Sequence, residues 1–181
     1  MNWYNHWFCF SAFIPEFLER IANEIDSPEV KGRILEIVCE EKGKDLSHSH
    51  SELFKQAMEL HGYKIELINS RAIKHLISEF ENSINYFDRE SFSIGVSFGL
   101  EIIAEENIDY LLSNTSESSF HYKKNRESLF FKIHLVNEAE HIAKCIENIQ
   151  VVSQENKESL KAGIKLSLLF WKSFWEEALD V

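Results

Sequence analysis

Apolar residues recur along the chain every three or four positions, which is the spacing expected on one face of an α-helix. No stretch of useful length alternates apolar and polar residues with the period of two that a half-buried strand requires. The pattern predicts helices near residues 3–25, 28–41, 50–62, 66–85, 90–113, 124–150 and 155–178. We therefore expect an all-α fold of about seven helices, a bundle formed by a single domain over residues 1–181.

Local signals mark several of these helix boundaries. Ser27 is a residue type that caps a helix, and Pro28 suits the first helical position. Ser49 and Glu52 have the spacing of a capping box, in which each side chain binds the backbone N–H of the other residue. Pro15 lies inside the first predicted helix, where its missing N–H should produce a kink. The boundary signals agree with the apolar periodicity.

Composition supports a folded helical domain and limits its partners. Hydrophobic residues make up 44% of the 181 residues, which is enough for a core, and only six Gly and two Pro are present. The formal net charge is −11, and no cluster of Lys and Arg reverses it locally. Nucleic acid and anionic membrane surfaces are therefore poor electrostatic partners, and we expect neither.

Compartment is predicted from the ends of the chain and from its cysteines. The N-terminal segment lacks the basic region and cleavage site of a signal peptide, and no window reaches the roughly 18 apolar residues of a membrane span. Cys9, Cys39 and Cys145 are widely spaced and odd in number, which is not typical of a disulfide framework or a zinc site. We therefore expect a cytoplasmic protein.

The segment FFKIHLVNEAEH, residues 130–141, contains the first candidate chemistry. His134, Glu138 and His141 occupy positions i, i+4 and i+7, and because each helical residue turns by about 100°, they lie on one face. Two imidazoles and a carboxylate without a thiolate favour Fe or Mn as a metal ion. The same spacing is also found on solvated helix faces and among hydrogen-bonded core histidines, so the segment alone leaves both interpretations open.

A second candidate ligand lies on the fifth predicted helix. Glu101 shares a helix face with apolar residues, and burying a lone carboxylate there is costly unless it is paired or binds a metal. Glu105 lies one turn further along on the same side and competes with it. Pairing with Lys, or exposure at the edge of the core, would account for either acid equally well.

The junction CEEKGKDLSHSH offers a third set of ligands. Glu40 and Glu41 end the second predicted helix, and His48 and His50 begin the third. Acids and histidines are common at exposed helix junctions, so this segment is weak alone. Together, however, the three segments supply carboxylates and histidines from several helices, which is how dimetal carboxylate sites are built in helical bundles.

The order Glu, His, Glu and then His-x3-Glu-x2-His resembles that of the heme-oxygenase-like dimetal oxidases of the TenA/PqqC-like superfamily, also called iron-containing redox enzymes. The segment ending in EKG resembles the family's E-x-G helix end, and HSELFKQAMELHG resembles its H-x2-L-[FW] segment with a later Gly. HLVNEAEH resembles the family's H-x3-D-x2-H. The resemblance covers approximately residues 4–150.

The resemblance implies a heme-oxygenase-like (TenA-like) helical fold and a set of metal ligands. The implied ligands, matched position by position, are Glu41, His50, Glu101, His134, Glu138 and His141. Glu138 departs from the family pattern, because an Asp is usual there and Glu is one methylene longer. The family's opening helix also has no clear counterpart here, so we expect it to be missing or shortened.

The function implied by the resemblance is that of a non-heme di-iron oxidase or oxygenase. It would bind two Fe ions, or Fe and Mn, and activate O2 on a small organic substrate, as a homodimer. One alternative is a metal-free TenA-like hydrolase of thiamin-related compounds, with Cys145 or Cys39 as nucleophile. Another is a non-catalytic helical interaction module. The aromatic ends, MNWYNHWFCF and LLFWKSFWEEAL, are interpreted as core or dimer surface.

Overall fold

The computed structural model describes residues 3–44, 46–114 and 128–180, except for the side chains of Asn114 and Glu138, and these ranges contain helices, turns and loops but no strand. In chain order the helices are α1 (Trp3–Asn23), α2 (Pro28–Glu41), α3 (His50–Glu59), α4 (Arg71–Ser83), α5 (Arg89–Glu101), α6 (Ala104–Asn114), α8 (Leu129–Gln150), the 3-10 turn η1 (Gln154–Asn156) and α9 (Lys157–Leu179).

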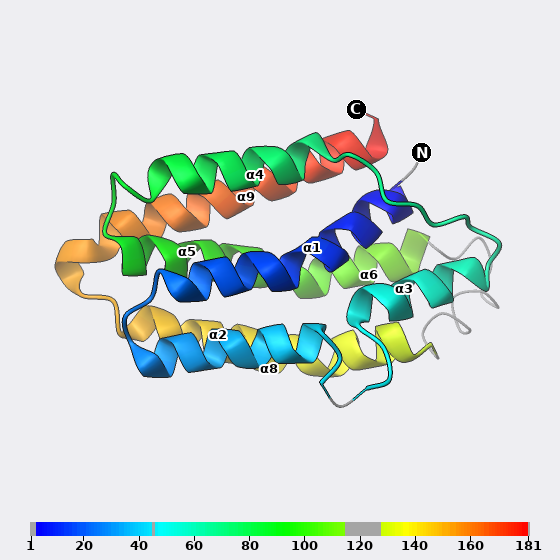
Figure 1. The fold of residues 1–181 in the computed structure, drawn as a ribbon, viewed down its shortest axis with the longest axis horizontal. Coiled ribbons are helices and arrows are strands. Elements are labelled where there is room, and N and C mark those ends of the chain that lie inside the picture. Colours follow the sequence, from blue (N-terminus) through cyan, green and yellow to red (C-terminus); the bar gives the residue numbers. More distant parts are fainter. Residues whose placement is uncertain (1–2, 45, 115–127, 181) are drawn as a thin grey trace.

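The caps expected between the first three helices are present. The side chain of Ser27 accepts a hydrogen bond from the backbone N–H of Val30, and Pro28 is the first residue of α2. Ser49 and Glu52 form the reciprocal capping box at the start of α3. Pro15 lies within α1, and Figure 1 shows that helix changing direction along its length. Local sequence therefore sets where α2 and α3 begin.

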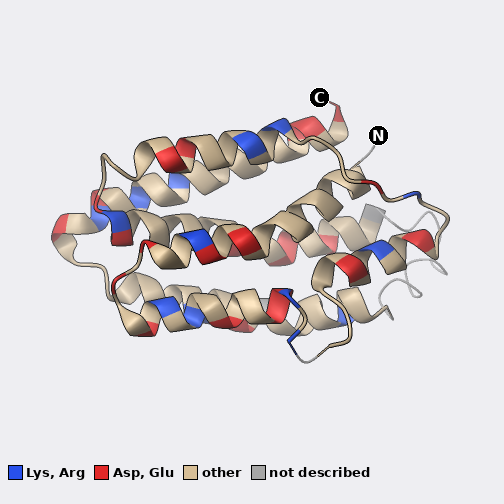
Figure 2. Cartoon of the chain, viewed as in Figure 1, with Lys and Arg blue, Asp and Glu red and all other residues tan. Residues whose placement is uncertain are grey.

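Three layers of helices make up the bundle (Figure 1). Helices α4 and α9 form one layer, α1, α5 and α6 form the middle layer, and α2, α3 and α8 form the other outer layer. The end of α2, the start of α3 and the end of α5 all lie close to the central part of α8 (Figure 1). Acidic and basic residues are interspersed over the drawn ribbon, and Lys and Arg form no continuous basic face in this view (Figure 2).

Small residues hold α5 against α9. A Cβ atom on Gly95 would lie 2.1 Å from the carbonyl oxygen of Leu160, and one on Gly163 would lie 2.1 Å from that of Phe92. The hydroxyl of Ser167 also donates to the carbonyl of Val96 at 2.8 Å. Larger side chains would separate the two backbones, so these residues determine the position of α5 and of Glu101 at its end.

Two predicted boundaries differ from the structure. The expected helix over residues 90–113 is interrupted, because α5 ends at Glu101 and α6 begins at Ala104. Apolar residues continue through Ile102 and Ile103, so periodicity has no signal for this break. The expected helix over 66–85 begins later, at Arg71, after a non-helical segment. The start expected near residue 124 lies outside the described residues.

None of the described helices combines the length and the apolar character needed to cross a membrane. Cys9, Cys39 and Cys145 are not joined by disulfides in the described part of the chain. The aromatic ends pack mainly into the core, where Trp7, Phe10 and Trp171 are buried. This confirms the interpretation of these ends as packing, although Leu168 and Leu169 of the second segment are exposed.

Candidate metal centre

A sharp connection between α2 and α3 brings Glu41 and His50 together. Glu41 is the last residue of α2 and His50 is the first of α3. Gly43 has a φ of +79°, and a Cβ atom there would lie 2.2 Å from the carbonyl oxygen of His48, so only glycine fits this turn. The chain returns on itself, and His50 Nδ1 lies 3.0 Å from Glu41 Oε1.

His134 completes a buried group with these two residues, called here the first group. The rings of His50 and His134 have centroids 4.7 Å apart, and the ligand atoms of Glu41, His50 and His134 all lie within 4.8 Å of one another. His50 is 2% exposed and His134 6% exposed, while the side chain of Glu41 keeps 11% of its surface exposed. Three potential ligands from three helices therefore converge away from solvent.

The contacts within the first group favour metal ligation over internal hydrogen bonding. Although His50 Nδ1 lies close to Glu41, it has no hydrogen-bond partner of acceptable geometry among the described residues. His134 Nδ1 lies 2.8 Å from the carbonyl oxygen of Phe130, to which it donates. That bond leaves His134 Nε2 without a proton, and a backbone partner of this kind typically orients a metal-binding histidine.

A second group consists of Glu101 and His141. His141 lies on the same face of α8 as His134, about two turns further along the helix. His141 Nδ1 lies 3.7 Å from Glu101 Oε2, and His141 Nε2 lies 2.8 Å from Glu40 Oε2. Lys144 holds the other Glu40 oxygen at 3.1 Å. If Nε2–H donates to Glu40, the lone pair on Nδ1 is directed toward Glu101, which is the carboxylate–histidine arrangement of many metal sites.

The electrostatics of the first group suit a bound cation. Burial lowers the pKa of His134 to about 4, so its imidazole is neutral at neutral pH. Burial alone would raise the pKa of Glu41, but the adjacent His50 imidazole outweighs it and lowers that pKa. Glu41 and Glu101 each end a helix, where the macrodipole is negative and a positive ion is favoured.

The structure separates the competing candidate ligands. His48 is exposed, and its Nδ1 lies 2.7 Å from the Ser47 hydroxyl, whereas His50 is in the buried group. Glu105 is exposed near the start of α6, whereas Glu101 is buried. Glu138 lies on α8, but its side chain is outside the described residues. Glu40 lies beside Glu41 in the sequence, but its contact with His141 is shown only by the structure.

Both groups border one small cavity. Its volume is about 40 Å³, and Glu41, His134 and Glu101 lie in its wall. Three aromatic residues from the two ends of the chain form much of the remaining wall: Trp7, Phe10 and Trp171. From the sequence these rings are interpreted as core or dimer surface, because nothing local indicates which core residues face a ligand. The cavity links the two groups and keeps them in apolar surroundings.

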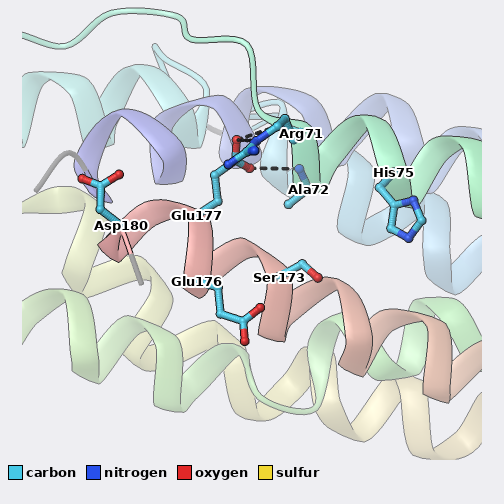
Figure 3. Close-up of a pocket in the computed structure, with 7 residues that line it drawn as sticks. All are labelled: Arg71, Ala72, His75, Ser173, Glu176, Glu177 and Asp180. Atoms are coloured by element: carbon cyan, nitrogen blue, oxygen red, sulfur yellow. Dashed lines mark hydrogen bonds and ion pairs between the residues drawn. The ribbon is translucent and has the colours of Figure 1, made fainter.

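Larger clefts lie elsewhere. One, of about 300 Å³, reaches His50 and Glu40 from another side and is lined also by Lys44, Asn137 and Glu140. Another, of about 560 Å³, lies between α4 and α9 (Figure 3). There Glu177 accepts hydrogen bonds from the backbone N–H groups that begin α4, so this cleft surrounds a structural joint.

Comparison with known proteins supports the fold. No family model matches the chain, and no curated protein matches it. A crystal structure of a CADD-like protein of unknown function from Nostoc punctiforme is similar, with a TM-score of 0.81. The two chains are 16% identical, and the match covers 97% of this chain and 79% of the other. Likeness at this identity shows the fold alone: the predicted all-α bundle is confirmed, and its fold is shared with this CADD-like protein.

Proposed function

We propose that this chain is a non-heme dimetal oxidase or oxygenase that acts on a small organic molecule. The observation that carries the proposal is the first group, in which Glu41, His50 and His134 converge within 4.8 Å in a buried position. Burying such groups without a counter-ion or hydrogen bond is costly, and His50 Nδ1 has no such bond among the described residues. A metal ion satisfies all three.

The donor set fits two divalent ions of the iron or manganese type. Glu41, His50 and His134 would hold one ion, and Glu101 and His141 would hold the other. Glu138 is proposed as a further ligand from its position on α8. Nitrogen and carboxylate donors without thiolate are typical of Fe and Mn sites. When bound, such a pair of ions supplies the binding and reduction of O2, chemistry that no side chain provides alone.

The protein's own residues prepare the site for that chemistry. The Phe130 carbonyl fixes the tautomer and orientation of His134, and Glu40 does the same for His141. The lowered pKa of His134 keeps that imidazole unprotonated and available as a ligand. Trp7 and Trp171 exclude bulk water from the cavity, which protects an oxidising site from side reactions.

The sizes of the two cavities beside the metal centre indicate where O2 and the organic substrate would each bind. The cavity of about 40 Å³ between the two groups has room for a molecule as small as O2 or water. The cleft of about 300 Å³ is large enough for a small organic substrate, and its polar residues, including Lys44 and Asn137, would orient one. We therefore propose that the substrate is small and polar and approaches from the side of His50.

Iron binding provides the direct test. Protein purified from iron-supplemented cells should contain about two Fe per chain by mass spectrometry, and His134→Ala should lose most of it. His48→Ala is the matched control, because this exposed histidine lies outside both groups. Full iron content in His134→Ala would overturn the proposal. We also propose a homodimer, for which a monomer in light scattering would be the contrary result.

A further inference from the structure

A line of aromatic rings connects the metal cavity with the molecular surface. Trp7 and Trp171 both border the cavity, and their rings are stacked with centroids 6.0 Å apart and an interplanar angle of 20°. Trp175 stacks on Trp7 with centroids 6.2 Å apart and an angle of 24°. Tyr110 lies against Trp175 at 4.8 Å and is 38% exposed. The line therefore ends in contact with solvent.

The rings come from three helices that meet at one end of the bundle. Trp7 is on α1, Tyr110 is on α6, and Trp171 and Trp175 are one turn apart on α9. Figure 1 shows the start of α1, α6 and the end of α9 together at the end where both termini lie. Helices distant in sequence thus supply consecutive members of one line.

The residue types in the line differ from those of the surrounding core. Phe10 and Phe174 pack against Trp7, but a phenyl ring is not oxidised under conditions that proteins tolerate. Indole and phenol lose an electron far more easily, and the chain has only four Trp, of which Trp7, Trp171 and Trp175 lie in this line. Aromatic packing alone would be served equally well by Phe at these positions.

Hydrogen bonding determines what each ring can do when it is oxidised. The indole N–H groups of Trp7 and Trp171 are buried and have no hydrogen-bond partner among the described residues. That of Trp175 donates to the amide oxygen of Asn107 at 2.9 Å, and an amide is too weak a base to take the proton. An oxidised indole here keeps its N–H proton and remains a strong oxidant. It therefore takes an electron from the next ring in the line.

Tyr110 has the complementary property. Because its side chain is partly exposed, its phenol proton can pass to water when an electron is lost, which leaves a neutral phenoxyl radical. This phenoxyl radical is a weaker oxidant than an indole radical cation that has kept its N–H proton. The oxidising equivalent therefore moves outward along the line, from the cavity to Tyr110, and the electron moves inward.

We propose that Trp7, Trp171, Trp175 and Tyr110 form an electron relay between the surface and the metal centre. The inference rests on the proposed function, because O2 at that centre is the oxidant. Tyr110 would lose one electron to Trp175 and one proton to water, and that electron would pass through Trp7 and the stacked Trp171 toward the ions that the two groups would hold, where O2 would supply the oxidising equivalent. A one-electron donor in solution, of the thiol or ascorbate class, then returns one electron and one proton to Tyr110.

The relay can be tested on the full chain after its metal has been removed by chelation. A short ultraviolet laser pulse photoionises tryptophan in place, so that buried rings are oxidised without access by a reagent. In the presence of an electron scavenger, tryptophanyl absorption should decay while phenoxyl absorption rises, at a rate that does not depend on protein concentration. Tyr110→Phe should lose most of that phenoxyl signal, and Trp175→Phe should slow its rise severalfold.

A tyrosine outside the line of rings provides the control for Tyr110. Tyr86→Phe removes an exposed tyrosine that lies outside the line and should leave the transfer unchanged. Unchanged phenoxyl yield in Tyr110→Phe, which alters a partly exposed residue and is compatible with folding, would overturn the relay. Because no metal is present, this test fails or succeeds independently of the iron content of His134→Ala, which tests the proposed function.

Discussion

The two halves of the candidate metal centre are built differently. In the first group, three side chains converge with a buried nitrogen, His50 Nδ1, that has no hydrogen-bond partner among the described residues. In the second group, His141 lies between Glu101 and Glu40, and Lys144 neutralises part of that negative charge. In the first group no Lys or Arg of the described residues pairs with Glu41, whereas in the second Lys144 already pairs with Glu40.

This difference indicates an order of metal binding. An ion at the first group breaks no existing hydrogen bond and enters a site whose ligands are already in place, which reduces the cost of binding. An ion at the second group binds a histidine that also belongs to the network of Glu40 and Lys144. We therefore expect the first ion to bind more tightly at Glu41, His50 and His134.

The largest effect should follow removal of a ligand from the first group. His50→Ala removes one of three converging donors and should lower the iron content of the purified protein by more than half, because the tighter ion is lost and the weaker site is only partly filled after purification. His141→Ala should lose the weaker ion and keep the tighter one. Mass spectrometry of metal per chain distinguishes the two variants, and equal losses would contradict the proposed order.

A smaller effect is expected from Glu40, which touches His141 and not the first group. Glu40→Gln should weaken the second ion by about 10–100-fold, the usual cost of losing a partner that orients a ligand. Isothermal titration with Mn²⁺ would resolve the two affinities. Glu36→Gln is the matched control, because Glu36 also pairs with Lys144 but does not contact His141. An unchanged second affinity in Glu40→Gln would exclude this orienting role.

Metal should also stabilise the fold through the helices that it connects. A ligand that binds only the folded state at a hundred times its Kd stabilises by about 2.7 kcal/mol, which corresponds to a rise in Tm of about 5–10 °C for a chain of this length. Calorimetry with and without Mn²⁺ should show this rise in the unaltered protein. His134→Ala should show little of it, and an equal rise there would place the binding outside the first group.

The smallest effect concerns Glu177, which connects α9 to the start of α4 at a distance from the metal centre. Burial alone would raise the pKa of Glu177, but the N–H groups of Ala72 and Arg71 and the Ser70 hydroxyl outweigh it and lower that pKa (Figure 3). The carboxylate therefore stabilises the fold above its ordinary pKa of 4.5, and this contribution is lost as the pH falls through the lowered value.

Glu177→Gln should thus cost about 1 kcal/mol at neutral pH, measured as unfolding free energy in urea. The difference from the unaltered protein should shrink in acid, because both side chains are then uncharged. Iron content should not change, since the joint contacts neither group. A loss of iron in this variant would show that the fold as a whole, and not the two groups, controls metal content.

Local pattern was sufficient for much of the fold. The starts of α2 and α3 follow from Ser27, Pro28 and the Ser49 capping box, because a cap depends on residues within one turn. The break between Glu101 and Ala104 was not predicted, because Ile102 and Ile103 continue the apolar pattern. Tertiary packing of α5 on α9 lies outside what periodicity can indicate.

The sequence by itself determined the helices and the shared face of His134 and His141, since both follow from the turn per residue within one helix. Only the tertiary structure decided that Glu41 and His50 meet His134, that Glu40 touches His141, and that Trp7 borders the cavity. These contacts join segments far apart in the chain, and their distances depend on how the helices pack.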